Sequence, residues 1–239
     1  MPFYERQDKI LNLLADGEET SLSRLAGKLF ISLPTLRRDL IKLEERGLVE
    51  RMHGRVRKKR DAADVKVPFS LREESASEEK IKIAIKAARL VKDGDTVMLD
   101  GSTSAYCIIP YLKEYKDILV ITSGAKASLL LAHLGIPNIC TGGRMINSSF
   151  SYVGEDAVKT ILSYNADVSF FSCRGLSEDG IPTDSSAEEN EIRRAMISRS
   201  KKHVLLCDRK KLGKTYLNNL CKKDVVDLII TGGDEDEKA

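Results

Sequence analysis

The sequence has few residues that bind metals or form disulfides. Its 239 residues include five cysteines and three histidines, all widely scattered, and no Cys-x-x-Cys pair. An odd, dispersed set of cysteines is typical of free thiols in a reducing compartment rather than of disulfides or zinc ligands. We therefore expect neither a disulfide nor a bound metal.

Long apolar runs and targeting signals are also missing. No stretch approaches the roughly 20 apolar residues of a membrane-spanning helix, and residues 1–6 lack the layout of a signal peptide. Neither Gly-x-Gly-x-x-Gly nor the P-loop pattern Gly-x-x-x-x-Gly-Lys-Ser/Thr occurs, which counts against a bound dinucleotide or nucleotide. We expect a cytoplasmic protein without a membrane partner and without a cofactor.

What the chain does have is an uneven distribution of charge. Residues 1–60 carry 14 Lys and Arg against 9 Asp and Glu, an excess of five positive charges, whereas the other residues carry an excess of two negative charges. The length suits two compact domains. Positive charge confined to the N-terminal quarter is expected if only this part meets nucleic-acid phosphates.

Residues 32–47 have the pattern of one amphipathic helix with both ends marked. Ser32 is a favourable N-cap, Pro34 is tolerated in the first turn, and Gly47 is a typical stop. Helical spacing of about 100° per residue gives the helix an apolar stripe and a basic outer face. The stripe consists of Leu36, Leu40 and Leu43. By itself, this pattern also suits an ordinary surface helix whose arginines are solvated.

The preceding residues complete a helix–turn–helix. Periodic apolar residues predict a first helix over 4–16 and a second helix that Thr20 or Ser21 caps. A short turn at residues 30–31 then leads into the basic helix, so the bihelical unit spans about residues 21–40. In such a unit the second helix enters the major groove of DNA.

A basic run follows this helix and is typical of a β-wing. Residues 48–52 are strand-like, His53 and Gly54 supply a turn, and residues 55–60 return with five basic side chains in six. Cations on a wing lie along the DNA backbone or enter the minor groove. The alternative is a flexible, solvated linker.

Several of these segments match a known pattern. They are Glu5-Arg6, residues 35–40, Leu43-Glu44, Gly47 and residues 51–54. On their basis, residues 5–57 resemble the winged helix–turn–helix of the DeoR family of bacterial transcriptional regulators. One departure is visible, because Arg55 stands where the family usually has a second glycine after His-Gly. The resemblance implies a DNA-binding domain over residues 1–60 that binds a double-stranded operator.

We expect DNA contacts from the basic helix and from the wing. Arg37 and Arg38 suit a guanine or a phosphate, and Thr35 suits a thymine methyl group or a phosphate. The full set of expected DNA-binding residues is Ser32, Thr35, Arg37, Arg38, Lys42, Arg51, His53, Arg55, Arg57 and Lys58.

Beyond an expected linker over residues 61–76, the pattern becomes that of an α/β domain over residues 77–233, followed by an acidic tail at 234–239. Six short apolar runs without polar alternation are separated mostly by helical segments, which predicts a mainly parallel sheet covered on both faces. The runs are residues 96–100, 118–122, 138–141, 168–172, 203–207 and 226–231. The expected core draws on Val97, Leu99, Leu119, Ile121, Phe170, Leu205 and Ile229.

Three small polar loops follow successive strand-like runs, at residues 100–104, 122–124 and 141–144. Ligands of such sheets bind outside the carboxyl ends of the strands, and glycines, hydroxyls and a helix start together suit a phosphate. The alternative is a plain turn whose hydroxyls cap the next helix. Three such loops in succession favour a phosphorylated small ligand.

The C-terminal part also matches a known pattern. Besides the loop at 100–104, the matching positions are Gly142, Gly143, Gly154, Asp167, Phe170, Gly175, Gly180, Glu189, Met196, Asp208, Lys211 and Gly213. Residues 77–230 thus resemble the DeoR-family sensor domain, which is related in fold to sugar-phosphate isomerases. Arg193 departs from a common lysine, and residues 231–234 depart from a usual Thr-Asp.

The resemblance implies a phosphorylated sugar as effector. The residues expected to bind it are Asp100, Gly101, Ser102, Thr103, Ser104, Ser123, Gly142, Gly143, Arg144, Asp208 and Lys211. We therefore expect a transcription factor, usually a repressor, whose DNA affinity the effector controls. Paired DNA half-sites imply a homo-oligomer, a dimer or larger.

Two other functions remain open from the sequence. An isomerase-like enzyme is one, because carboxylates and an amine for proton transfer are available, although a fold does not establish activity. Those groups are Asp100, Asp184, Glu188, Glu189, Asp208 and Lys211. The other is a thiol-sensing regulator that uses Cys107 or Cys173.

Overall fold

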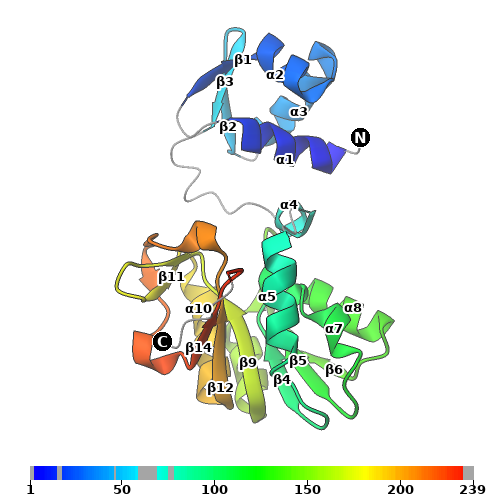
Figure 1. Cartoon of the computed structure of the whole chain (residues 1–239), viewed down its shortest axis with the longest axis vertical. Coiled ribbons are helices and arrows are strands. Elements are labelled where there is room, and N and C mark those ends of the chain that lie inside the picture. Colours follow the sequence, from blue (N-terminus) through cyan, green and yellow to red (C-terminus); the bar gives the residue numbers. More distant parts are fainter. Residues whose placement is uncertain (1–2, 15–17, 46, 59–68, 75–77, 234–239) are drawn as a thin grey trace. The chain divides into compact units, whose positions relative to one another are not determined.

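The structure of this chain is a computed structural model (Figure 1). It describes residues 3–14, 18–45, 47–58, 69–74 and 78–233. The chain divides into two compact units, residues 1–75 and 76–239. Each unit has a hydrophobic core of its own.

The N-terminal unit contains the predicted helix–turn–helix. Helix α1 spans Phe3–Leu13, α2 spans Leu22–Leu29 and α3 spans Leu33–Glu45. Ser21 is the residue that caps α2, because its Oγ accepts a hydrogen bond from the Arg24 N–H at 3.3 Å. Ser32 Oγ likewise accepts a hydrogen bond from the Thr35 N–H at 3.4 Å, at the start of α3. Phe30 lies between the two helices in a left-handed conformation with φ 53°.

The predicted leucine stripe of α3 lies in the core of this unit. Leu36, Leu40 and Leu43 are completely buried against Ile10 of α1 and Leu25 of α2. Burial of each such side chain contributes about 1.5–3 kcal/mol to the free energy of folding. The apolar periodicity therefore fixes which face of α3 points inward and leaves its basic face outside.

The predicted wing is present as an antiparallel hairpin. Strand β2 spans Val49–Met52 and β3 spans Arg55–Lys58, with Gly54 at φ 70° in the turn. A third strand, β1 at Glu19–Ser21, pairs with β3 and gives the sheet order β1-β3-β2. Nothing in the sequence predicted β1, because three residues are too few to show an alternating pattern. Residues 59–60 of the basic run lie outside the described residues.

Part of the expected linker is helical. Helix α4 spans Phe69–Glu74 and packs against α1 in the N-terminal unit, with Phe69 only 2% exposed. Within the segment expected as a linker, residues 69–74 are therefore helical rather than irregular. Pro68 precedes this helix, and a proline is tolerated at a helix start even though it excludes a helix interior. The rest of the expected linker lies outside the described residues.

The C-terminal unit is built on a parallel sheet of six strands in the order β14-β12-β9-β4-β5-β6. The strands are β4 at Thr96–Leu99, β5 at Leu119–Thr122, β6 at Asn138–Cys140, β9 at Ala166–Ser172, β12 at Ser200–Leu206 and β14 at Leu228–Ile230. Each of the six apolar runs predicted from the sequence overlaps one of these strands. The predicted parallel sheet is therefore confirmed.

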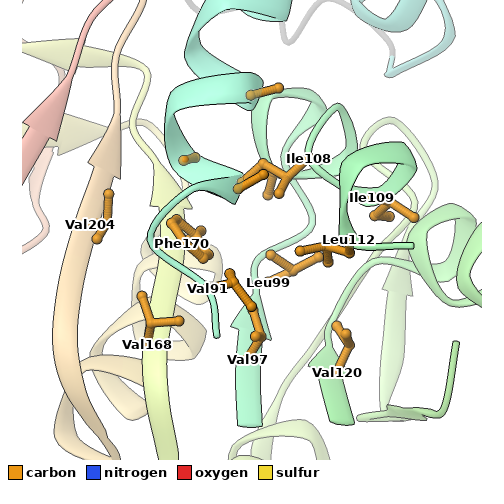
Figure 2. Close-up of a cluster of buried hydrophobic side chains, with 14 of the residues drawn as sticks. Val91, Val97, Leu99, Ile108, Ile109, Leu112, Val120, Val168, Phe170 and Val204 are labelled. Atoms are coloured by element: carbon orange, nitrogen blue, oxygen red, sulfur yellow. The ribbon is translucent and has the colours of Figure 1, made fainter. Parts of the chain in front are cut away.

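Helices cover both faces of this sheet. Helices α5 (Glu78–Ala88), α6 (Thr103–Tyr106), α7 (Ile109–Leu112) and α8 (Ala125–His133) pack on one face, and α9 (Glu155–Leu162) and α10 (Ala187–Ser198) pack on the other. Figure 2 shows Leu99 and Phe170 in the first of these layers. Met98 points to the opposite layer, as the alternation along a strand requires. Of the predicted core residues, only Leu119 is half-buried rather than buried.

Short elements that the sequence did not predict surround the carboxyl end of the sheet. Strands β7 (Arg144–Ile146) and β8 (Ser151–Val153) form a hairpin, and β10 (Gly175–Leu176), β11 (Pro182–Asp184) and β13 (Asn218–Asn219) form a small antiparallel sheet. Single-turn helices span Arg209–Lys211 (η2) and Lys223–Val225 (η3). None of the helices in the described part of the chain has both the length and the apolar character needed to span a membrane.

Candidate functional site

The outer face of α3 presents two arginines to solvent. Arg37 and Arg38 are exposed, and neither side chain is bonded to any residue that the structure describes. At the start of the helix, Ser32 is exposed, and its Oγ lies 2.8 Å from Oγ1 of the half-buried Thr35. The two guanidinium groups therefore need no exchange of partners before they bind an external acceptor.

The stretch of chain that leads up to and includes these arginines carries charge of one sign. Residues 22–38, which run from the first residue of α2 into α3, contain four basic side chains and no Asp or Glu. The basic residues are Arg24, Lys28, Arg37 and Arg38, and all four are exposed. An acid-free, basic stretch on a helix–turn–helix matches the negative phosphate backbone of DNA.

The wing presents its arginines differently. Arg51 on β2 is bonded to Glu44 of α3, with Nη2 and Oε2 2.6 Å apart. On β3, Arg55 pairs with Glu19 at 3.2 Å and Arg57 pairs with Glu50 at 2.8 Å. These three predicted DNA-binding arginines are thus held by carboxylates on neighbouring elements. The other predicted residues here are the exposed His53 and Lys42 and the half-buried Lys58.

In the C-terminal unit, Asp100 is bonded within the protein rather than directed at solvent. It follows β4 and is 2% exposed. Its Oδ1 accepts the Ser102 N–H at 3.1 Å, and its Oδ2 accepts the Ser172 N–H at 3.1 Å and Nε of Arg193 at 2.9 Å. Asp100 therefore shapes the loop that follows it and joins the ends of β4 and β9.

Arg193, on α10, is the partner that makes this burial of a carboxylate possible. Besides Asp100, its Nη1 donates to Oδ2 of Asp184 at 2.8 Å and to Oδ1 of Asn190 at 3.0 Å. Burial lowers the pKa of Arg193, but the charges of Asp184, Asp100 and Glu189 outweigh it and hold the pKa above its ordinary value. A cation thus fixed neutralises the buried carboxylates.

Lys211 belongs to the same network. Its Nζ donates to Ser172 Oγ at 2.8 Å and lies 3.4 Å from Oδ2 of Asp208. Ser172 donates its backbone N–H to Asp100 and its Oγ–H to the carbonyl of Leu206 at 2.6 Å. The predicted residues Asp100, Asp208 and Lys211 are therefore brought together, and Ser172 connects them.

The predicted phosphate loop lies beside the loop that follows β5. Ser102 caps the short helix α6, because its Oγ accepts the Ala105 N–H at 3.1 Å. A Cβ on Gly101 would lie 1.9 Å from Oγ of Ser151, and a Cβ on Gly124 would lie 3.3 Å from Cα of Gly101. The predicted residues Thr103, Ser104 and Ser123 of these two loops are buried. Glycine is needed at 101 because β8 leaves no room for a side chain.

The third predicted loop has contacts of another kind. Gly142 and Gly143 follow β6, two strands away from β4, with φ 65° and 97°. A Cβ on Gly143 would lie 2.7 Å from the carbonyl oxygen of Val153 and 3.1 Å from Cβ of Ala157. Arg144 is exposed and forms an ion pair with Glu188 of α10. These residues connect the β7–β8 hairpin to the helices behind it, a tertiary role that the sequence did not reveal.

Three residues that contact the predicted site were not predicted from the sequence. Ser172 is the last residue of a strand, and the rule that ligands bind at strand ends points to it. Arg193 was noted only as a departure from a lysine, and Ser151 gave no signal. Their roles depend on contacts between residues that are 50 to 93 positions apart in the chain.

Two of the five cysteines are placed away from reagents in solution, and the other three are half-buried. Cys173 and Cys207 are buried, follow the adjacent strands β9 and β12, and share a hydrogen bond. That bond lowers the pKa of Cys173 against the effect of burial, whereas the same bond and burial raise the pKa of Cys207. Cys107 is half-buried. In the described part of the chain, no group of three His, Cys, Asp or Glu side chains is placed to hold a metal ion.

Comparison with known proteins places both units. Residues 6–60 match the family model described as "DeoR-like helix-turn-helix domain", and residues 75–233 match "DeoR C terminal sensor domain". The chain is 33% identical over 230 residues to the HTH-type transcriptional regulator GolR of Listeria innocua, covering 95% of this chain and 90% of that protein. It is 27% identical over 237 residues to a lactose phosphotransferase system repressor of Staphylococcus epidermidis, covering 98% and 94% of the two chains.

Solved structures share the fold at low identity. The delta subunit of eIF2B from Chaetomium thermophilum has a TM-score of 0.53 at 16% identity, covering 95% of this chain and 87% of that chain. A ribose 5-phosphate isomerase from Methanocaldococcus jannaschii has a TM-score of 0.42 at 19% identity, covering 56% of this chain and 53% of that chain, too low to bear on activity. The two family matches and the relatives over nearly the full length show that the chain belongs to the DeoR family of helix–turn–helix transcriptional regulators.

Proposed function

We propose that this transcriptional regulator is a repressor whose affinity for its DNA operator changes when a phosphorylated sugar binds to the C-terminal unit. The observation that carries the proposal is the presence, in one chain, of a helix–turn–helix with an acid-free basic stretch over residues 22–38 and of an Asp–Arg–Ser–Lys network at the strand ends of a parallel sheet. The name of the staphylococcal relative supports the roles of repressor and of sugar response.

The DNA contacts divide into two groups. Arg37 and Arg38, with no partner among the described residues, are placed to contact base edges or phosphates in the major groove. The wing residues Arg51, Arg55 and Arg57 share their charge with carboxylates, so they strengthen binding through phosphate contacts rather than through base recognition. The other members of the interface are Ser32, Thr35, Lys42, His53 and Lys58.

The effector binds at the carboxyl ends of β4, β5, β9 and β12. The N–H groups of Thr103 and Ser104, the first two residues of α6, lack an intrahelical acceptor by position and, with Gly101 and Ser123, receive the phosphate. Asp208 and Lys211 receive the sugar hydroxyls. Asp100 and Ser102 hold this arrangement in place. Gly142, Gly143 and Arg144 complete the site from its edge.

Regulation requires that the effector bind one arrangement of the protein better than another, since equal affinity for both changes nothing. We propose a homo-oligomer, a dimer or larger, because one small module gives limited specificity and paired half-sites need paired modules. The protein works in the cytoplasm, where bacterial DNA is found.

Catalysis is not part of this proposal. Asp100 and Asp184 are both committed to Arg193, so neither is placed as a free base for an aldose–ketose isomerisation. The burial of Cys173 and Cys207 gives no support to a thiol sensor, because oxidants reach exposed thiolates first.

The test uses the full chain and a duplex that it selects from a randomised pool. DNA binding is measured by fluorescence anisotropy, and effector binding by thermal stability with a panel of pentose and hexose phosphates, the free sugars and nucleotides. We expect one sugar phosphate to raise the melting temperature and to change the DNA affinity. Stabilisation by free sugars or nucleotides and by none of the sugar phosphates contradicts the proposal.

A further inference from the structure

Arg193 is buried, but its hydrogen-bonding capacity is only partly used. Its side chain is 8% exposed, Nε is bonded to Asp100, and Nη1 is bonded to Asp184 and Asn190. Nη2, with two further N–H groups, donates to no residue in the described part of the chain. Nη2 is also absent from the fully enclosed atoms that lack a partner, so a small part of it remains accessible.

A donor in this position is a signal for a ligand. Buried polar groups are almost always hydrogen-bonded, and an unmade bond to a buried cation is unfavourable. The guanidinium is also rigidly held, because three acceptors on two other segments and on its own helix fix its plane. Nη2 therefore points in a fixed direction, as a recognition donor must.

Arg193 and Lys211 flank the same point of the sheet. The charges of both side chains act on Cys173, the residue that follows β9, and Ser172 beside it is bonded to Lys211 and to Asp100. Asp208 lies next to Lys211. We use the name Arg193 cluster for Arg193, Asp100, Asp184, Ser172, Lys211 and Asp208.

We propose that Nη2 of Arg193 donates a hydrogen bond to an uncharged oxygen of the effector, a hydroxyl or a carbonyl, and not to a phosphate oxygen. This inference rests on the proposed function and adds to it a binding residue and a selectivity. The effector is then a sugar with a single phosphate.

The charges of the Arg193 cluster favour an uncharged oxygen as the acceptor of the hydrogen bond from Nη2. Three carboxylates in the Arg193 cluster face two cations, and Glu189 adds a fourth carboxylate close enough to act on Arg193. A second phosphate placed against Nη2 meets an excess of negative charge at short range, which repels it. A hydroxyl accepts from Nη2 and donates to a carboxylate, so it satisfies both partners.

The first test measures selectivity in the unmodified full chain. Isothermal titration and thermal shift compare fructose 6-phosphate and glucose 6-phosphate with fructose 1,6-bisphosphate, with the free hexoses and with inorganic phosphate. We expect at least one monophosphate to bind ten times or more as tightly as the bisphosphate. Equal or tighter binding of the bisphosphate overturns the inference but leaves the proposed function in place. If no pentose or hexose phosphate of the full panel binds, both fail.

The second test changes the donor while it keeps the charge. R193K replaces the planar fork by an ammonium group, which cannot bond to Asp100 and Asp184 and still keep a donor in the direction of Nη2. The matched control is R194K on the same helix, whose guanidinium bonds to the carbonyl oxygens of Leu220 and Asn219. We expect R193K to bind the preferred monophosphate at least tenfold more weakly than the parent chain does. Inorganic phosphate should still raise the melting temperature of R193K as much as that of the parent. R194K should bind the monophosphate with parental affinity.

Outcomes of the second test are separable from misfolding. Circular dichroism and the melting temperature of the full chain report whether R193K retains its structure. A folded R193K that binds the monophosphate with parental affinity overturns the inference. If R193K does not fold, the comparison of monophosphate with bisphosphate binding in the unmodified chain still tests the inference.

Discussion

Arg6 on α1 and Asp39 on α3 form a two-pronged ion pair, with Nε–Oδ2 at 2.6 Å and Nη2–Oδ1 at 3.1 Å. Asp39 lies next to Arg38 in the sequence but points the other way, into the protein, where its side chain is 2% exposed. The hydrogen bond to Asp39 is the main cause that raises the pKa of Arg6 above its ordinary value. The pair thus fixes the rotation of α3 and with it the direction of the exposed arginines.

Loss of this pair should destabilise the N-terminal unit. Removing one partner of a largely buried pair costs about 3 kcal/mol, so D39A is expected to lower the free energy of unfolding and to weaken DNA binding as a consequence. Chemical denaturation followed by circular dichroism measures the effect. The control is D179A, at an exposed position in the C-terminal unit whose side chain is bonded to no described residue. Unchanged stability of D39A would show that the pair does not hold the helix.

Arg38 should act on DNA without acting on the fold. R38A is expected to lower the affinity for the selected duplex by about 1–3 kcal/mol, as for a lost base contact, with no change in melting temperature. Fluorescence anisotropy at fixed salt gives the affinity. K113A, an exposed lysine of the C-terminal unit, is the charge-matched control. Parental affinity of R38A would place this residue outside the groove.

The pairing of Arg57 with Glu50 predicts opposite effects of two substitutions. E50Q releases Arg57 and removes a negative charge near the DNA, so we expect tighter binding by about 0.5–1 kcal/mol. R57A is expected to weaken binding and to lower the slope of log K against log salt by about 1, the value for one phosphate contact. A salt titration of both variants measures these slopes. Identical slopes for R57A and the parent would exclude the contact.

The close approach of Gly101 and Ser151 predicts a compensating pair of substitutions. G101A places a Cβ 1.9 Å from Oγ and 2.7 Å from Cβ of Ser151, so the strand β8 must move. We expect a loss of about 1–3 kcal/mol in the free energy of unfolding and a loss of sugar-phosphate binding. The double variant G101A/S151G removes the clashing side chain and should regain most of the stability. If the double variant loses as much free energy of unfolding as the two single variants lose together, the clash is not the cause of the destabilisation by G101A.

The sequence by itself determined the helix–turn–helix, the wing and the six strands of the parallel sheet, together with their order. The caps at Ser21 and Ser32, the leucine spacing of α3 and the six apolar runs of the sheet depend on residues a few positions apart, and local backbone and packing preferences suffice to read them. Only the tertiary structure decided which polar groups remain available. It assigned Asp100 to Arg193, the wing arginines to carboxylates and Arg144 to Glu188. These pairs join different elements, in most cases from distant parts of the sequence, and no local pattern records whether a charge meets solvent or another charge.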